Sequence, residues 1–155
     1  ALRYPRGQAY AGLKEHRAPI VYGKSEWIYE ERQIAIFAVG NMMEEAVKVH
    51  ELLHEQGYDC SLNNVRFVKP LDKEALHKAA EEHLLIVTME ENILRGGFGY
   101  AAAAYLSAAD ETAKVLHFGI DDQFVQHGTV SQLHARIGLD AESMTDKIIE
   151  TYQNL

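Results

Sequence analysis

The stretch Ile34-Ala35-Ile36-Phe37-Ala38-Val39-Gly40 contains the pattern that decides the fold. Its first six residues are all apolar. Such a run is typical of a strand that is covered on both faces, as in a parallel sheet with helices on either side. Gly40 ends the run. We therefore predict a buried central strand over 34–39.

A helix pattern follows this strand directly. Apolar residues recur at helical spacing from Met43 to Leu53, and Asn41 with Glu44 three residues later fits a helix N-cap. Gly57 is placed to end the helix in a left-handed conformation. The stretch 34–57 is therefore predicted to be one strand–helix unit.

The same alternation recurs along the rest of the chain. Further strands are predicted at 26–29, 60–68, 84–89 and 115–120. Further helices are predicted at 71–82 with a cap at Asp72, at 98–109, at 130–137, and at 142–152 with a cap at Asp140. This alternation predicts an α/β fold of three layers, with a mostly parallel sheet of about five strands and helices on both faces.

Composition and charge narrow the class of protein. The 155 residues are 47% hydrophobic and 25% charged, which is typical of one globular domain. A formal charge of −8 argues against a nucleic-acid or anionic-membrane partner. The longest apolar run is far shorter than the roughly 20 residues of a membrane helix. A single cysteine, Cys60, cannot form an internal disulfide, so we expect a reducing, cytoplasmic location.

The segment His50-Glu51-Leu52-Leu53-His54 matches the zincin pattern H-E-x-x-H, in which two imidazoles share a helix face and bind zinc. Gly57 also fits the longer metzincin pattern, but the third histidine of that pattern would fall at Cys60. A zinc hydrolase that uses these residues is an alternative function. We predict no stoichiometric zinc, because the third ligand is missing and Gly57 ends the helix.

Two other segments carry weaker signals. Gly97-Phe98-Gly99-Tyr100-Ala101-Ala102 resembles the dinucleotide pattern G-x-G-x-x-A, but it lies too far from the preceding strand, so we expect a tight turn and close packing. Glu90-Glu91-Asn92 follows a buried strand at its carboxyl end, where α/β sheets place their sites. Carboxylates at such a position are suited to act as general acids or bases. More often, however, they cap nearby amides or support an interface.

The first residues carry a possible anion site. In Arg3-Tyr4-Pro5-Arg6-Gly7, two guanidinium groups flank a rigid Tyr-Pro step. Such an arrangement presents fixed donors to a phosphate or a carboxylate, although a basic turn at a domain edge is an equal interpretation. Because the chain opens on Ala1 and not on methionine, we expect it to be a piece of a longer protein.

Several segments, spread over nearly the whole chain, form one joint pattern. They are Arg3-Tyr4-Pro5-Arg6-Gly7, Val65-Arg66-Phe67-Val68-Lys69-Pro70-Leu71-Asp72, Val87-Thr88-Met89-Glu90-Glu91-Asn92 with Gly96-Gly97-Phe98-Gly99, Phe124-Val125-Gln126-His127-Gly128 and Leu139-Asp140. In this order and at these intervals they resemble one family, the deoxyxylulose phosphate synthases of the transketolase superfamily. Transketolase-like enzymes and pyruvate dehydrogenase β-subunits share weaker versions of these motifs. Where the family has a proline, this chain has Asp121 in Gly119-Ile120-Asp121-Asp122.

The resemblance implies a chain that is one part of a three-domain transferase. Residues 1–25 would be the tail of the preceding pyrimidine-binding domain with a linker, and residues 26–155 a transketolase C-terminal domain. Thiamine diphosphate and magnesium would lie between the two upstream domains, where pyruvate loses carbon dioxide and its remainder joins glyceraldehyde 3-phosphate to give deoxyxylulose phosphate, a precursor of isoprenoids and thiamine.

The resemblance also implies which functions lie in this chain and which lie in the rest of the full-length enzyme, its parent. Arg6, and secondarily Arg3, would bind the phosphate of the substrate. No catalytic, cofactor-binding or metal-binding residue is expected in the chain, which by itself would be inactive and would serve packing and homodimerisation. The same kind of domain in an enzyme of the pyruvate dehydrogenase β-subunit type is an alternative.

Overall fold

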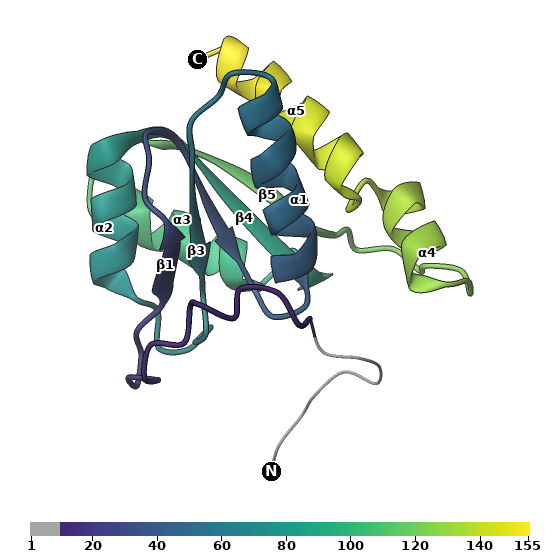
Figure 1. The fold of residues 1–155 in the computed structure, drawn as a ribbon, viewed down its shortest axis with the longest axis horizontal. Helices are drawn as coiled ribbons and strands as arrows, with labels where there is room; N and C mark the ends of the chain where they lie inside the picture. The colour runs from purple at the N-terminus through teal and green to yellow at the C-terminus, as the bar shows by residue number, and fades with distance from the viewer. Residues whose placement is uncertain (1–9) are drawn as a thin grey trace.

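The computed structural model describes residues 10–155, so the predicted substrate-binding residues Arg3 and Arg6 lie outside the described part. The described chain forms one five-stranded sheet between two layers of helices (Figure 1). The elements are β1 (Glu26–Tyr29), β2 (Gln33–Ala38), α1 (Met42–Glu55), β3 (Cys60–Asn64), α2 (Lys73–Glu82), β4 (His83–Ile93), α3 (Phe98–Ala108), β5 (Lys114–Ile120), α4 (Val130–Ile137) and α5 (Ala141–Gln153).

The sheet has the strand order β1-β3-β2-β4-β5. Strands β3, β2, β4 and β5 are parallel to one another, and β1 pairs antiparallel with β3 at one edge. The predicted three-layer α/β fold is confirmed. Strand β2 is central, as its uninterrupted apolar sequence predicted, and five of its six residues are buried.

Alternate residues of β2 pack on opposite faces of the sheet. Ile34 and Ile36 join the core under α1 and α5, which lie side by side in Figure 1. Ala35 and Phe37 join a second core under α2 and α3. This alternation follows from the two-residue period of a strand, and it explains why every position of β2 from Ile34 to Ala38 is apolar.

Most helix ends are where the sequence predicted them, but one cap is wrong. Asp72 accepts a hydrogen bond from the N–H of Ala75 at 3.3 Å, and Asp140 accepts one from the N–H of Ser143 at 3.0 Å. Gly57 has the left-handed φ of +84° that ends α1. Asn41, in contrast, makes no capping bond: its own backbone is already helical, with φ −63° and ψ −24°, and its side-chain amide donates to Glu91 at 3.2 Å.

Two strand ends differ from prediction, and both lie near the carboxyl edge of the sheet. Strand β3 stops at Asn64, before the predicted 68, because Arg66 adopts a left-handed φ of +43° and turns the chain away. Strand β4 continues to Ile93, past the predicted 89, because Ile93 pairs with Ile120 after an irregular register. Glu90, Glu91 and Asn92 therefore belong to a strand and not to a loop.

Residues 10–25 contain no helix or strand and run across the carboxyl edge of the sheet. A largely buried ion pair between Arg66 and Glu26 holds this segment. Arg66 also donates to the carbonyl oxygens of Ala18 at 3.2 Å and Pro19 at 3.4 Å, and Glu26 accepts from the N–H of Ala18. Arg66, part of one of the family-like motifs, thus fixes the path of the chain into β1. In the described part of the chain, no helix has the length and apolarity required to cross a membrane.

Candidate functional site

The carboxyl ends of β2, β3 and β4 meet at one edge of the sheet, where α/β folds place their sites. The glycine-rich turn before α3 lies at this edge, as does the start of α1. The central side chain is Glu90, which is only 3% exposed.

Glu90 caps helix α3 with both carboxylate oxygens. One accepts a hydrogen bond from the N–H of Phe98 and the other from the N–H of Gly99, each at 2.9 Å. The first N–H groups of a helix have no partner within the helix, and they carry partial positive charge. The capping role predicted for 90–92 is confirmed for Glu90, and its carboxylate is not free to act as a base.

Two glycines at the start of α3 leave room for neighbouring polar side chains, and Gly97 leaves it for this carboxylate. A Cβ atom on Gly97 would lie 2.5 Å from both oxygens of Glu90. A Cβ atom on Gly99 would lie 2.4 Å from Thr88 Oγ1 and 2.7 Å from His117 Nδ1. The helix end that would bind a phosphate in a dinucleotide fold thus holds an internal carboxylate, which confirms the packing interpretation of the glycine pattern.

His117 on β5 lies beside this cap. Its Nδ1 is 3.0 Å from Thr88 Oγ1, and its ring is tilted against Tyr100 with centroids 5.5 Å apart. Burial lowers the pKa of His117, and the nearby Glu90 carboxylate offsets only part of this effect. The ring is therefore held neutral as a packing and hydrogen-bonding group.

This arrangement predicts a pH-dependent stability. Because the pKa of His117 is lower in the folded state than in the unfolded state, the stabilisation is present above the unfolded pKa of about 6.5 and is lost as the pH falls toward the folded pKa. We expect the free energy of unfolding in urea to fall between about pH 7.5 and about pH 5.5. Burial also lowers the pKa of His50 and His83, so His117→Asn, which keeps an acceptor for Thr88, should reduce this dependence without abolishing it. His127→Asn at an exposed position should leave it unchanged. Equal pH dependence in His117→Asn and the unmodified chain would contradict the assignment.

Next to the buried cap, the same edge carries an exposed polar cluster. Glu91 accepts from Asn41 at 3.2 Å through one oxygen and lies 3.3 Å from His134 Nε2 through the other. These contacts join the start of α1 and the last turn of α4 to β4. Glu91 therefore supports the junction of three elements, and in this structure its oxygens face protein partners.

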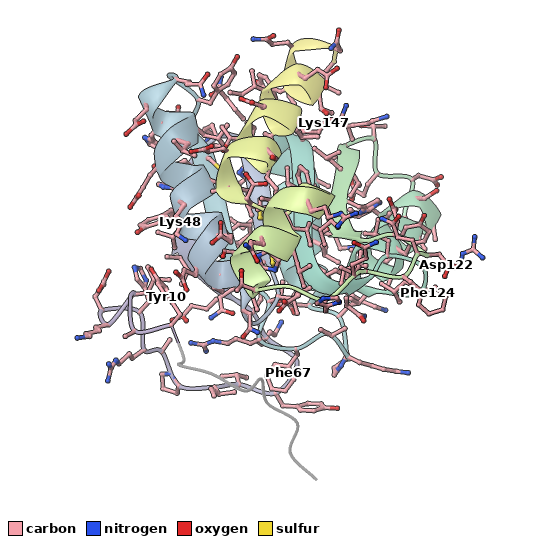
Figure 2. The ribbon with its side chains drawn as sticks, turned by 90° about the vertical axis from the view of Figure 1, so that its right-hand side faces the viewer. Tyr10, Lys48, Phe67, Asp122, Phe124 and Lys147 are labelled. Carbon is pink, nitrogen blue, oxygen red and sulfur yellow. The ribbon has the colours of Figure 1, made fainter. Side chains whose placement is uncertain are left out.

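Apolar side chains are exposed at this edge as well. Tyr22 is 78% exposed and packs edge to face on Phe67, with ring centroids 5.6 Å apart. Figure 2 shows Phe67 and Tyr10 at the lower end of the molecule and Phe124 on the connection after β5. Ile20 and Phe124 are largely or fully exposed. Large apolar side chains at a rim of this kind are typical of a surface that contacts protein.

Elsewhere in the described chain, buried polar pairs serve the fold. Ser61 Oγ lies 2.8 Å from His83 Nε2, but both residues are at most 5% exposed, and His83 Nδ1 faces the carbonyl oxygen of Ala79. Burial also raises the pKa of the Cys60 thiol well above its ordinary value. Neither the serine nor the cysteine is therefore an accessible nucleophile.

The H-E-x-x-H residues form a third cluster, away from this edge. His50 and His54 lie one turn apart on α1, with ring centroids 4.5 Å apart. Glu31, from the loop between β1 and β2, lies 2.6 Å from His54 Nε2 and 3.8 Å from His50 Nε2. Nothing in the sequence pointed to Glu31, because only the pairing of β1 and β2 with β3 brings that loop to α1. Glu31 is therefore available as the third ligand that the H-E-x-x-H segment itself lacks.

Comparison with known families identifies the class of protein to which this fold belongs. The family model for the C-terminal domain of transketolase matches residues 23–144. The chain therefore belongs to the transketolase C-terminal domain family. This finding confirms the resemblance seen in the sequence at the level of the family.

Two curated proteins that are similar to this chain share one name. The chain is 48% identical over 96% of its length to 1-deoxy-D-xylulose-5-phosphate synthase from Lachnoclostridium phytofermentans. It is 38% identical over 99% of its length to the synthase of the same name from Chlorobaculum tepidum. The chain spans 24% of the length of each of these two relatives.

Solved structures show the same fold. A split-gene transketolase, described as an inactive β4 tetramer, has a TM-score of 0.80 and 26% identity, over 86% of this chain and 44% of that one. A transketolase mutant from Pichia stipitis has a TM-score of 0.59 and 14% identity, over 84% of this chain and 18% of that one. The second likeness concerns the fold alone.

Proposed function

We propose that this chain is the C-terminal part of a 1-deoxy-D-xylulose-5-phosphate synthase, which condenses pyruvate with glyceraldehyde 3-phosphate and releases carbon dioxide. The observation that carries the proposal is the 48% identity over 96% of the chain to a curated synthase. This degree of similarity favours the synthase over the pyruvate dehydrogenase β-subunit type. The product would supply isoprenoid and thiamine synthesis.

In this proposal, thiamine diphosphate and Mg²⁺ bind to the upstream domains of the parent. The residues described here do not fit the cofactor, because the glycine-rich helix end that resembles a phosphate site is filled by Glu90. Thiamine diphosphate would supply the electron sink for decarboxylation of pyruvate. The chain itself would hold the fold and the packing surfaces and would be inactive alone.

The proposed domain boundary lies near residue 25. Residues 1–25 would be the tail of the preceding domain and its linker, and residues 26–155 the C-terminal domain. The Arg66–Glu26 ion pair supports this division, because it anchors the crossing segment where β1 begins. Arg6, and to a lesser extent Arg3, would then extend from this segment to the phosphate of the acceptor aldehyde.

We further propose that the parent is a cytoplasmic homodimer. The exposed apolar residues at the carboxyl edge, Ile20, Tyr22 and Phe124 among them, support a protein partner there, either the upstream domains or a second copy. A single buried cysteine is consistent with a reducing compartment.

Because the proposed cofactor sites lie in the upstream domains, we expect that the isolated chain does not bind thiamine diphosphate and releases no carbon dioxide from pyruvate. Titration calorimetry with thiamine diphosphate and Mg²⁺ should give no heat of binding for the chain and a saturable signal for the full-length parent. The parent should also form deoxyxylulose phosphate when both substrates are present. Micromolar cofactor affinity in the chain, or a parent that forms no deoxyxylulose phosphate, would overturn the proposal.

A further inference from the structure

Three side chains with metal-binding atoms converge between α1 and the loop after β1. They are Glu31, His50 and His54, and one ligand atom from each lies within 4.8 Å of the other two. Two imidazoles and one carboxylate form a donor set that zinc commonly binds in proteins. This cluster plays no part in the proposed function.

The contacts around the cluster fix the positions of two of its members. Glu31 accepts from the N–H of Cys60 at 2.8 Å through the oxygen that faces the histidines, and its own N–H donates to Ser61 Oγ at 2.8 Å. The ring of His50 stacks on Tyr29 at a centroid distance of 4.2 Å. Ligands that are oriented by such neighbouring bonds bind a metal more tightly than free side chains do.

One ligand atom lacks any partner. His50 Nε2 is buried and has no hydrogen-bond partner, although a buried polar nitrogen is normally paired. It points to the cluster, where Glu31 Oε2 is 3.8 Å away. That distance is too long for a hydrogen bond, so the ring nitrogen is left without a partner of either kind, donor or acceptor.

The distances in the cluster suit a shared cation. Two donor atoms on one tetrahedral zinc ion lie about 3.4 Å apart, because Zn–N and Zn–O distances are about 2.0–2.2 Å. The His50–Glu31 distance of 3.8 Å is close to that value. The His54–Glu31 distance of 2.6 Å must widen, and the His54 side chain, which is 40% exposed, has the space to move.

We propose that Glu31, His50 and His54 form a binding site for one zinc-class divalent cation, with solvent as the fourth ligand. Nitrogen donors from imidazole select zinc and its transition-metal neighbours over Mg²⁺ and Ca²⁺, which prefer oxygen. The cation would tie the loop between β1 and β2 to the last turn of α1. Neither the 310 Å³ pocket around His83 nor the 280 Å³ pocket around His117 borders the site, so the role proposed for the cation is to hold these two elements together.

The test is a titration of the chain, freed of metal and of any histidine tag, with Zn²⁺ by calorimetry and with Co²⁺ by visible absorption. We expect one ion per chain, an absorption band typical of tetrahedral Co²⁺, and a rise in the melting temperature on Zn²⁺ binding. His54→Ala and Glu31→Gln should each weaken the affinity by about tenfold or more. Glu31→Gln keeps an oxygen that can accept from Cys60, so the fold should persist.

A matched control comes from His77, which lies 2.8 Å from Glu111 but has no second histidine beside it. His77→Ala should leave Zn²⁺ affinity unchanged. Circular dichroism of each variant without metal shows whether it folds. Absence of saturable Zn²⁺ binding, or binding that both His54→Ala and Glu31→Gln leave intact, would overturn the proposal. Neither result bears on the synthase assignment, which the cofactor titration tests separately.

Discussion

Replacing Arg6 with alanine in the full-length parent is expected to lower kcat/KM for glyceraldehyde 3-phosphate by at least about tenfold. The proposed phosphate contact would use the planar guanidinium fork, and charge-assisted hydrogen bonds contribute on the order of 1.5 to 3 kcal/mol each. Even one such bond therefore exceeds the 1.4 kcal/mol, roughly, that corresponds to tenfold. The measurement is steady-state kinetics with each substrate varied.

One further variant tests whether the bidentate geometry of the Arg6 guanidinium is needed in addition to its charge, and another tests whether Arg3 takes part. Arg6→Lys should recover activity only in part, because lysine restores the charge without the bidentate geometry. Arg3→Ala should have a smaller effect, since only its proximity to Arg6 in the sequence supports its role. The affinity for thiamine diphosphate should stay unchanged in all three. Loss of cofactor affinity in Arg6→Ala, with unchanged aldehyde parameters, would show that Arg6 serves the cofactor.

Replacing Glu90 with alanine is expected to destabilise the chain by about 3 kcal/mol or more. The variant removes two hydrogen bonds from a carboxylate to backbone N–H groups, at about 1.5 kcal/mol or more each, and also the favourable charge at the start of α3. It leaves both amides buried without a partner. Urea unfolding monitored by circular dichroism measures the change in the free energy of unfolding.

Neighbouring positions provide matched controls for Glu90. Glu91→Ala removes a carboxylate one residue away that is exposed and should cost less than about 1 kcal/mol. Gly97→Ala should destabilise strongly without removing any charge, because its Cβ would lie 2.5 Å from both Glu90 oxygens. If Glu90→Ala and Glu91→Ala unfold at the same urea concentration, then Glu90 does not stabilise the chain by capping α3.

The fold could be read from local patterns in the sequence. A run of apolar residues such as 34–39 requires cover on both faces, and the capped helices between such runs supply it. Caps that act within one helix, such as Asp72 and Asp140, were predicted correctly because both partners lie within three residues of each other. The motifs of the transketolase C-terminal domain family also lie in contiguous segments.

Contacts between distant segments were beyond sequence reasoning, and they decided the chemistry. Asn41 makes no capping bond and instead donates to Glu91 on β4, the strand that pairs with β2. Glu90 was one of three residues predicted to cap nearby amides, and only the tertiary structure showed that it caps the two amides at the start of α3.

The metal cluster shows the same limit most clearly. The sequence supplied His50 and His54 because they share one helix face, a local property of the helix. It could not supply Glu31, because that residue reaches them only after β1 and β2 have both paired with β3. The sequence by itself therefore determined the elements, the family and two of the three candidate ligands. Tertiary structure decided which side chains meet, because meeting depends on strand order and register and not on spacing along the chain.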